Sequence, residues 1–214
     1  MTINVTVTSD FICPWCLIGE RRLFRAIEGL PAEVDVEVQW RPFELNPDMP
    51  KAGMDRRTYR SRKFGSWERS QALDANTVTA AKADGVTLDY DRITRTPNTF
   101  AAHRLAWLAA QQGVQHAVVT ALLEAYFVEG RDVGDVGVLA EIADEGGIDP
   151  ARARAFLESE EGVTEVQTLL ADVRLHGIHG VPHFDIEGLT VTGAQRPELL
   201  RQAILDVHAR QEAA

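Results

Sequence analysis

The sequence is poor in cysteine and in basic residues. Only two of its 214 residues are cysteine, and 32 Asp and Glu outweigh 22 Lys and Arg. Two cysteines are too few for a secreted scaffold held by several disulfides, and too few for a zinc finger that pairs two Cys-X-X-Cys sites. The formal charge of -10 argues against the extended cationic face that binds phosphates, so we expect no nucleic-acid partner.

The sequence also lacks a long apolar run. The apolar stretch 118–128 is interrupted by Glu124, and no segment reaches the roughly 18 uninterrupted apolar residues that a membrane span needs. At the start of the chain, no basic segment precedes an apolar stretch of signal-peptide length. We therefore expect a cytoplasmic protein with no membrane partner, in which a cysteine pair serves redox or metal chemistry instead of a permanent structural bond.

Periodic patterns at both ends of the chain predict strands. Alternating apolar residues over 3–7 and 34–40 predict two strands with a helix between them. Segments 184–187 and 189–192 predict a hairpin, and 196–210 has the single apolar face of a final helix. Further helices are predicted to begin near residues 98, 114, 135, 149 and 163. The first strand-helix-strand unit is then expected to be a parallel crossover.

The two cysteines stand together at the start of the first helix, in the segment Cys13-Pro14-Trp15-Cys16. Pro14 suits the first helical turn, where the missing N–H costs nothing. Such a pair on the first helix of this element order is the thioredoxin-like arrangement, so we predict an α/β fold. The predicted parts are a thioredoxin-like core over 1–50 and 178–214 and an inserted all-helical domain over 51–177.

The spacing of the cysteines favours disulfide exchange. This reaction needs one thiolate that attacks and a second thiol that resolves the mixed disulfide. Cys13 lies at the helix start, where free N–H groups and the helix dipole favour a thiolate, so we predict that it is the nucleophile. Cys16 lies one turn inside and is predicted to be the less exposed, resolving thiol. A metal is not expected, because zinc needs four ligands and no second cysteine pair exists.

A second motif, Val181-Pro182-His183, lies far downstream and directly before a predicted strand. An isolated X-Pro bond is usually trans, but together with the upstream cysteine pair this one is expected to be cis. Val181 would then present its N–H and C=O to a substrate chain. His183 has two interpretations: a titratable ring beside the redox pair, which stabilises a Cys13 thiolate when protonated, or a half-exposed ring that points away.

Several spaced segments together resemble the FrnE-like branch of the DsbA family. They are residues 11–19, 41–50, 97–99, 102–105, 125–127, 180–184 and 193–195. The resemblance extends over almost the whole chain, from about residue 3 to about residue 208. It implies a thioredoxin-fold disulfide oxidoreductase with an inserted helical domain, cytoplasmic in this branch. It also implies that Cys13 and Cys16 are the redox pair and that Pro182 is cis.

Two relatives of that branch, 2-hydroxychromene-2-carboxylate isomerase and the kappa-class glutathione transferases, have serine in place of the attacking cysteine and bind glutathione. The resemblance therefore implies glutathione or another thiol as a co-substrate, with no tightly bound cofactor. The peptide backbone of glutathione would be held by Val181 and by Ala194 and Gln195 at the start of the last helix. A helix start is a favourable place for a carboxylate. Pro14 and Trp15 are predicted to contact the same substrate.

Other residues of the family pattern have two interpretations each. Asn98 and His103 either line a substrate groove or form the cap and first turn of a buried helix. The segment 51–70 is rich in Lys and Arg, which suits either a solvated helix face or an attraction for an anionic substrate such as glutathione.

The leading functional prediction is a cytoplasmic thiol-disulfide oxidoreductase that reduces or isomerises disulfides in a protein or in a small thiol compound. One alternative is a glutathione-dependent isomerase or transferase that acts on an aromatic small molecule, and another is a chaperone-like binding module. Apolar residues on the insertion are compatible with a homodimer as well as with internal packing.

Overall fold

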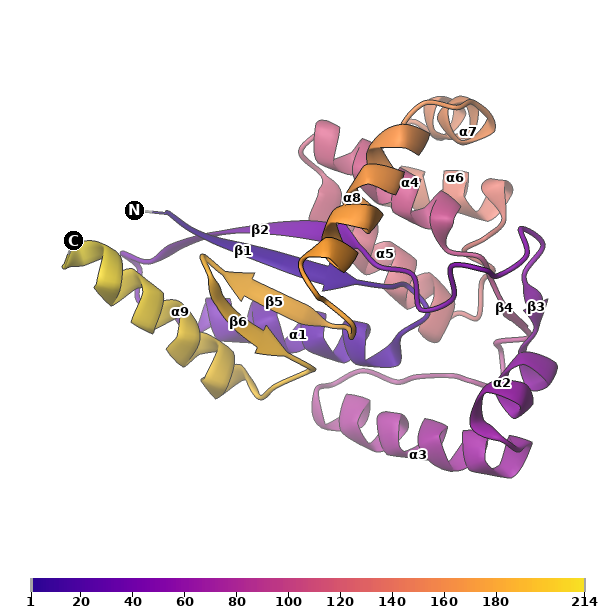
Figure 1. Cartoon of the computed structure of the whole chain (residues 1–214), viewed down its shortest axis with the longest axis horizontal. Helices are drawn as coiled ribbons and strands as arrows, with labels where there is room; N and C mark the ends of the chain where they lie inside the picture. The colour runs from indigo at the N-terminus through magenta and orange to yellow at the C-terminus, as the bar shows by residue number, and fades with distance from the viewer. Residues whose placement is uncertain (1, 214) are drawn as a thin grey trace.

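A four-stranded sheet lies at the centre of the computed structural model, which describes residues 2–213 (Figure 1). Its strands are β1 (Thr2–Ser9), β2 (Asp35–Pro42), β5 (His183–Ile186) and β6 (Leu189–Thr192), in the spatial order β2-β1-β5-β6. β1 and β2 run parallel, whereas β5 is antiparallel to both β1 and β6. The predicted parallel crossover and the predicted C-terminal hairpin are both confirmed.

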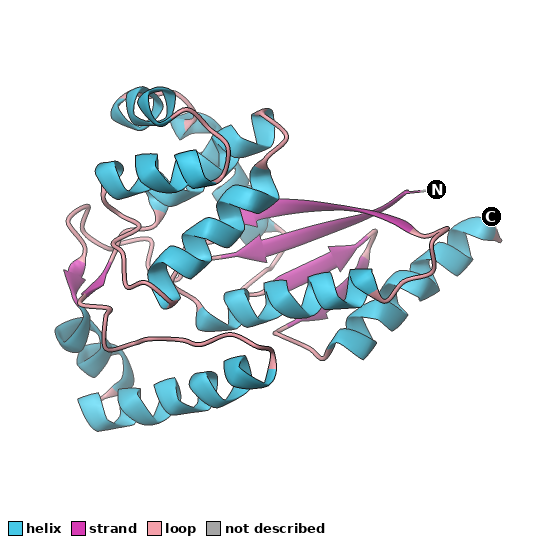
Figure 2. Cartoon of the chain, turned by 180° about the vertical axis from the view of Figure 1, so that it is seen from behind, coloured by secondary structure: helices cyan, strands magenta, loops and turns pink. Residues whose placement is uncertain are grey.

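Helices α1 (Pro14–Glu28) and α9 (Pro197–Glu212) pack together on one face of this sheet, the face that Figure 2 shows in front. Strand side chains alternate between the two faces, so Phe184 points toward α1. The approach is close, because a Cβ atom added at Gly19 would lie 2.8 Å from Cγ of Pro182 and 3.2 Å from Cζ of Phe184. Glycine at this position lets the first helix touch the loop that precedes β5.

The segment between β2 and β5 is mostly helical. Its helices are α2 (Arg56–Phe64), α3 (Trp67–Ala83), α4 (Phe100–Gln111), α5 (Gln115–Phe127), α6 (Val136–Glu145), α7 (Pro150–Glu158) and α8 (Val163–Leu175). A short antiparallel sheet of β3 (Met54–Asp55) and β4 (Arg95–Thr96) differs from the all-helical insertion that we predicted. Strands of two residues are too short for a period-two pattern to reveal.

Helix α3 has no counterpart among the predicted helices, and its buried face explains why. The buried residues of this 17-residue helix are Ser70, Asp74, Thr77 and Ala81, so no apolar stripe marks it in the sequence. The predicted helix starts farther along the chain are confirmed, and two of them have the expected side-chain caps. The side chains of Asp135 and Asp149 accept backbone N–H groups at the starts of α6 and α7.

One cluster of buried apolar side chains runs from the sheet into the inserted helices. It includes Val5 of β1, Leu17 of α1, Leu105 of α4 and Leu122 of α5. The sheet and the insertion therefore share a continuous core, which holds them together by burial of apolar surface. In the part of the chain that the structure describes, no helix is both long enough and apolar enough to cross a membrane.

Candidate active site

Cys13 occupies the N-cap position of α1, with non-helical backbone angles of φ -97° and ψ 110°. The N–H of Cys16 donates to the carbonyl of Cys13 at 2.9 Å, which closes the first turn between the two cysteines. Cys13 is 6% exposed and Cys16 only 1% exposed. The predicted placement is confirmed: one cysteine lies at the helix start, and the other lies one turn inside and is less accessible.

The surroundings of Cys16 favour its protonated form. Burial raises the pKa of the Cys16 thiol well above its ordinary value, and a hydrogen bond with Cys13 raises it further. Cys16 is therefore a thiol and not a thiolate at neutral pH. Since the thiolate is the nucleophile in disulfide exchange, Cys16 is the weaker attacking group in the resting protein.

The Val181–Pro182 peptide bond is cis, as predicted. The Cys13 thiol donates to the carbonyl of Val181 over 3.6 Å between Sγ and O, although the two residues are 168 positions apart in the sequence. On the far side of the proline, the N–H of Gly193 donates to the Pro182 carbonyl at 2.8 Å. The fold therefore brings Cys13, Val181 and Pro182 together and joins them to the segment that precedes α9.

Ala194 and Gln195 lie in that segment and are tied to their surroundings by main-chain carbonyls. The Arg22 guanidinium of α1 donates to the carbonyl of Ala194 at 2.5 Å, and it also pairs with Asp84 at 2.7 Å. The side-chain amide of Gln195 donates to the carbonyl of Thr192 at 2.9 Å. The helix that carries the cysteines thus holds the start of α9 through Arg22, a connection that no local sequence pattern predicts.

A cavity of about 330 Å³ opens beside Cys13. Pro14 and Trp15 line it, as expected of residues that contact a substrate, and Trp15 is 38% exposed. Its opposite wall comes from α2, α3 and the segments near Tyr90 and Tyr126. Figures 1 and 2 show α2 and α3 beside the N-terminal end of α1. The sequence left two interpretations of the basic segment 51–70, and its place beside the cysteine site suits the second, an attraction for an anionic substrate.

Among the residues that the structure describes, those that line this cavity do not include Asn98 or His103. The Asn98 amide donates to the carbonyl of Met49 at 2.7 Å, and its oxygen accepts the N–H of Phe100 at 3.0 Å. Asn98 therefore ties the first turn of α4 to the segment that follows β2. This arrangement matches the structural interpretation of Asn98. Asn98 also borders a separate surface groove of about 890 Å³ whose lining does not include Cys13, so contact with the substrate of Cys13 stays a prediction.

His103 is only 4% exposed and lies beneath the loop that leads to Cys13. Its Nε2 lies 2.9 Å from the carbonyl oxygen of Phe43, 3.5 Å from Oδ1 of Asp10, and its ring packs on Phe11 at 4.8 Å between centroids. Asp10 is itself buried and accepts the N–H of Leu45 at 2.7 Å. His103 and Asp10 thus brace the loop from below, and nothing in the sequence singled out Asp10.

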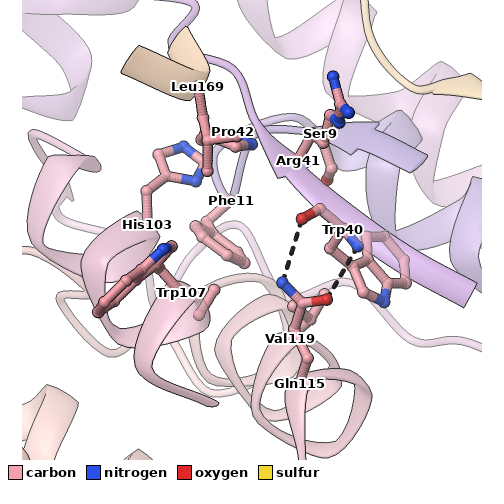
Figure 3. A pocket seen from close by; sticks show the side chains of 11 residues that line it. Ser9, Phe11, Trp40, Arg41, Pro42, His103, Trp107, Gln115, Val119 and Leu169 are labelled. Atoms are coloured by element: carbon pink, nitrogen blue, oxygen red, sulfur yellow. Dashed lines mark hydrogen bonds between the residues drawn. The ribbon is translucent and has the colours of Figure 1, made fainter. Parts of the chain in front are cut away.

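Figure 3 shows a second, much smaller hollow next to His103. Its volume is about 30 Å³, which is room for roughly one water molecule and not for a substrate. The Gln115 amide spans this hollow toward β2: it accepts the N–H of Trp40 at 2.9 Å and donates to the Trp40 carbonyl at 3.1 Å. This part of the molecule fixes β2 against α5 and leaves the larger cavity as the substrate-sized space beside Cys13.

His183 lies on the sheet face opposite α1. Its Nδ1 is 3.0 Å from Oγ1 of Thr192, and it borders a surface hollow together with Thr8, Arg41 and His176. Since Phe184 points toward α1, its neighbour His183 points to the other face. Burial lowers the pKa of His183, so its ring is mostly neutral at pH 7. The structure corrects the first interpretation of His183, because the ring points away from the redox pair.

A family model for a DSBA-like thioredoxin domain matches residues 4–205. The chain belongs to this family. The uncharacterized protein YwbO of Bacillus subtilis (strain 168) is 30% identical over 207 residues, which cover 96% of this chain and 98% of YwbO. The crystal structure of a probable DsbA oxidoreductase from Streptomyces coelicolor is 31% identical, with a TM-score of 0.86 over 97% of this chain and 90% of the other.

More distant solved structures share the fold. The cytosolic disulfide reductase DsbM from Pseudomonas aeruginosa is 19% identical, with a TM-score of 0.65 over 97% of this chain and 99% of DsbM. A 2-hydroxychromene-2-carboxylate isomerase is 16% identical, with a TM-score of 0.74 over 98% of both chains. DsbA-like oxidoreductases and the isomerase are the neighbours that the resemblance to the FrnE-like branch implies, so that expectation is confirmed.

Proposed function

We propose that this DSBA-like protein is a thiol-disulfide oxidoreductase that uses Cys13 and Cys16 as its redox pair. The observation that carries the proposal is the position of Cys13. Its sulfur lies at the N-cap of α1 and 3.6 Å from the carbonyl oxygen of Val181, with Cys16 buried directly behind it. An attacking sulfur, a main chain that can hold a substrate and a resolving thiol are the three parts that disulfide exchange requires.

In the first step, the Cys13 thiolate attacks one sulfur of the substrate disulfide. The substrate S–S bond breaks, its other sulfur leaves as a thiolate, and a Cys13-substrate mixed disulfide forms. The main chain of Val181 lies beside the attacking sulfur, so an extended substrate segment can pair with it as a strand pairs with a sheet edge.

In the second step, Cys16 loses its proton and attacks Cys13. The second substrate sulfur leaves, Cys13 and Cys16 become a disulfide, and the substrate has gained two electrons. The raised pKa of Cys16 means that deprotonation precedes this attack, so the step becomes faster as the pH rises.

Reduction or isomerisation in the cytoplasm is the working direction that we propose. Pro14 and Trp15 add no charge between the cysteines, so neither an extreme oxidant nor a strongly reducing exchanger is expected. Two molecules of a donor thiol would supply the two electrons that reduce the Cys13–Cys16 disulfide, and they would leave as the donor's own disulfide, which completes the cycle. Glutathione is the candidate donor, because DsbM from Pseudomonas aeruginosa, which has a similar fold, has been solved with GSH.

Reduction of insulin with dithiothreitol tests the assignment. Cys13→Ser should abolish the acceleration, whereas Cys16→Ser should keep the first attack and accumulate a mixed disulfide that mass spectrometry detects. Turnover of Cys13→Ser at the rate of the unaltered protein would defeat the proposal. Cys16→Ala in cells should trap the physiological substrate on Cys13 for identification.

A glutathione-dependent isomerase or transferase stays the second candidate, because the isomerase shares this fold and an aromatic-lined cavity lies beside position 13. Glutathione binding to the reduced protein, measured by calorimetry, together with isomerase activity that persists in Cys13→Ser, would favour it. A chaperone-like module would instead suppress aggregation equally well in a Cys13→Ser, Cys16→Ser double variant.

A further inference from the structure

The cavity beside Cys13 contains more positive than negative charge. Two guanidinium groups share a single carboxylate: Nη2 of Arg56 lies 2.7 Å from Oδ2 of Asp74, and Nη2 of Arg60 lies 2.5 Å from Oδ1. Lys63 adds a third cation to the wall, and Asp74 is the only acidic side chain among the described residues that line it. Arg56 is just 5% exposed, so water does little to screen its charge.

The tyrosines of the cavity do not supply the missing negative charge. Burial raises the pKa of both Tyr90 and Tyr126, which keeps each phenol neutral at any physiological pH. The hydroxyl of Tyr90 lies 2.6 Å from Oγ1 of Thr77, and that of Tyr126 donates to the carbonyl of Arg95 at 3.2 Å. Burial also lowers the pKa of Arg60, as expected of a cation whose partner is shared. An anionic ligand would neutralise the excess positive charge of the cavity.

The remaining walls of the cavity are mostly apolar. Aromatic rings dominate them, namely those of Tyr59, Phe64, Tyr90, Tyr126 and Phe127. Arg56 lies 5.0 Å from the centroid of Tyr90, and Arg60 lies 4.7 Å from that of Phe64, so the cations are positioned over ring faces. A volume of about 330 Å³ is at the lower end of the range for small-molecule sites, which suits a planar ring.

We propose that this cavity selects a low-molecular-weight aromatic disulfide that carries a carboxylate or similar anionic group. The ring lies between the aromatic walls, the anionic group faces Arg60, and the disulfide sulfur reaches Cys13. The inference rests on the proposed function, because the reaction is the same exchange at Cys13. The Cys13 thiolate displaces one aryl thiolate, Cys16 displaces the second, and the protein disulfide forms as two electrons pass to the ligand.

Two disulfide reagents of different charge test this selection. In 5,5′-dithiobis(2-nitrobenzoate) each aromatic ring carries a carboxylate, whereas 4,4′-dithiodipyridine is uncharged at neutral pH. Stopped-flow absorbance gives the rate of each with the fully reduced protein. Arg60→Gln should slow the first reagent at least about tenfold, which is about 1.4 kcal/mol. The second reagent should be slowed much less, so the ratio of the first rate to the second should fall.

Arg62→Gln is the matched control, because Arg62 is exposed on the same helix, carries the same charge and lies outside the cavity lining. It should leave the ratio of the two rates at the value of the unaltered protein. Equal ratios in Arg60→Gln and Arg62→Gln would overturn the inference while the exchange reaction stands. Full reactivity of Cys13→Ser toward both reagents would instead overturn the proposed function.

A measurement on the unaltered protein avoids any loss of fold in the variants. The sulfur-free anion 2-nitrobenzoate should occupy the cavity and slow the reaction of Cys13 with 4,4′-dithiodipyridine in a saturable way. The neutral 2-nitrobenzamide, of nearly the same shape, should protect at least about tenfold more weakly. Equal protection by the two compounds, or none by either, would refute an anion-selective aromatic site.

Discussion

Gly19→Ala should destabilise the protein, although alanine is normally the better helix residue. In a helix interior, alanine is favoured over glycine by roughly 1 kcal/mol. At Gly19 the added Cβ would lie 2.8 Å from Cγ of Pro182 and 3.2 Å from the ring of Phe184. Neither neighbour can swing aside easily, because one is a closed ring and the other is fully buried. Overpacking typically costs about 1–3 kcal/mol, and two neighbours that cannot move place Gly19 in the upper half of that range, from which the propensity gain of about 1 kcal/mol is subtracted.

The net effect should be a loss of about 1–2 kcal/mol, which lowers Tm by roughly 3–6 °C for a protein of this size. Because Pro182 must shift, the Val181 carbonyl should move away from Cys13, and the rate of insulin reduction should fall as well. Thermal unfolding followed by circular dichroism, together with the insulin assay, measures both effects.

The control for this prediction is Gly180→Ala. Gly180 lies in the loop that contains Pro182, and a Cβ added there would meet nothing within 4 Å. It should change stability by less than about 0.5 kcal/mol. A rise in Tm for Gly19→Ala, as expected of an unobstructed helix position, would refute the close packing of α1 against Pro182.

Three further predictions follow from the buried ionisable groups. Release of the second chromophore from 5,5′-dithiobis(2-nitrobenzoate) depends on Cys16, and its rate should rise roughly tenfold per pH unit from pH 6 to 8; a flat profile would contradict a raised pKa of Cys16. Asp74→Asn leaves Arg56 and Arg60 without their carboxylate and should cost about 3–5 kcal/mol in urea unfolding, whereas a loss under 1 kcal/mol would show that the pair is well solvated. Burial raises the pKa of Glu20, so the folded protein binds a proton there that the unfolded chain releases, and stability falls as the pH rises above about 4.5. Glu20→Gln should therefore raise the free energy of unfolding at pH 7 and not at pH 4, and the same gain at both pH values would argue against this linkage.

Local patterns in the sequence predicted most of the elements correctly. The alternation in β1 and β2, the capping residues Asp135 and Asp149, and the glycine between β5 and β6 all have a direct local effect on the backbone. Such signals act between residues close in the chain, so they can be read without knowledge of distant contacts. Helix α3 escaped prediction because its buried face is polar, and those polar groups find partners only in the folded protein.

In the candidate site too, local signals could be read from the sequence, whereas contacts between distant residues could not. The sequence indicated the two cysteines and the downstream proline, and the family resemblance implied that the proline is cis. The direction of the His183 side chain was left open, because the face it takes depends on how β5 pairs with β1. Asp10 was missed because a single buried aspartate before a helix carries no distinguishing pattern. Its importance appears only when His103 and Leu45 lie against it.

The amino-acid sequence by itself determined the four strands of the central sheet, most of the helices, the position of the cysteine pair at a helix start, and the family to which the chain belongs. Tertiary structure alone decided what surrounds Cys13. The walls of its cavity come from three parts of the chain that lie far apart in the sequence: the start of α1, the region from α2 through α3 to Tyr90, and the end of α5 at Tyr126. Two arginines on one carboxylate give this cavity its charge, and that arrangement exists only because folding buries α2 and α3 against each other beside the redox pair.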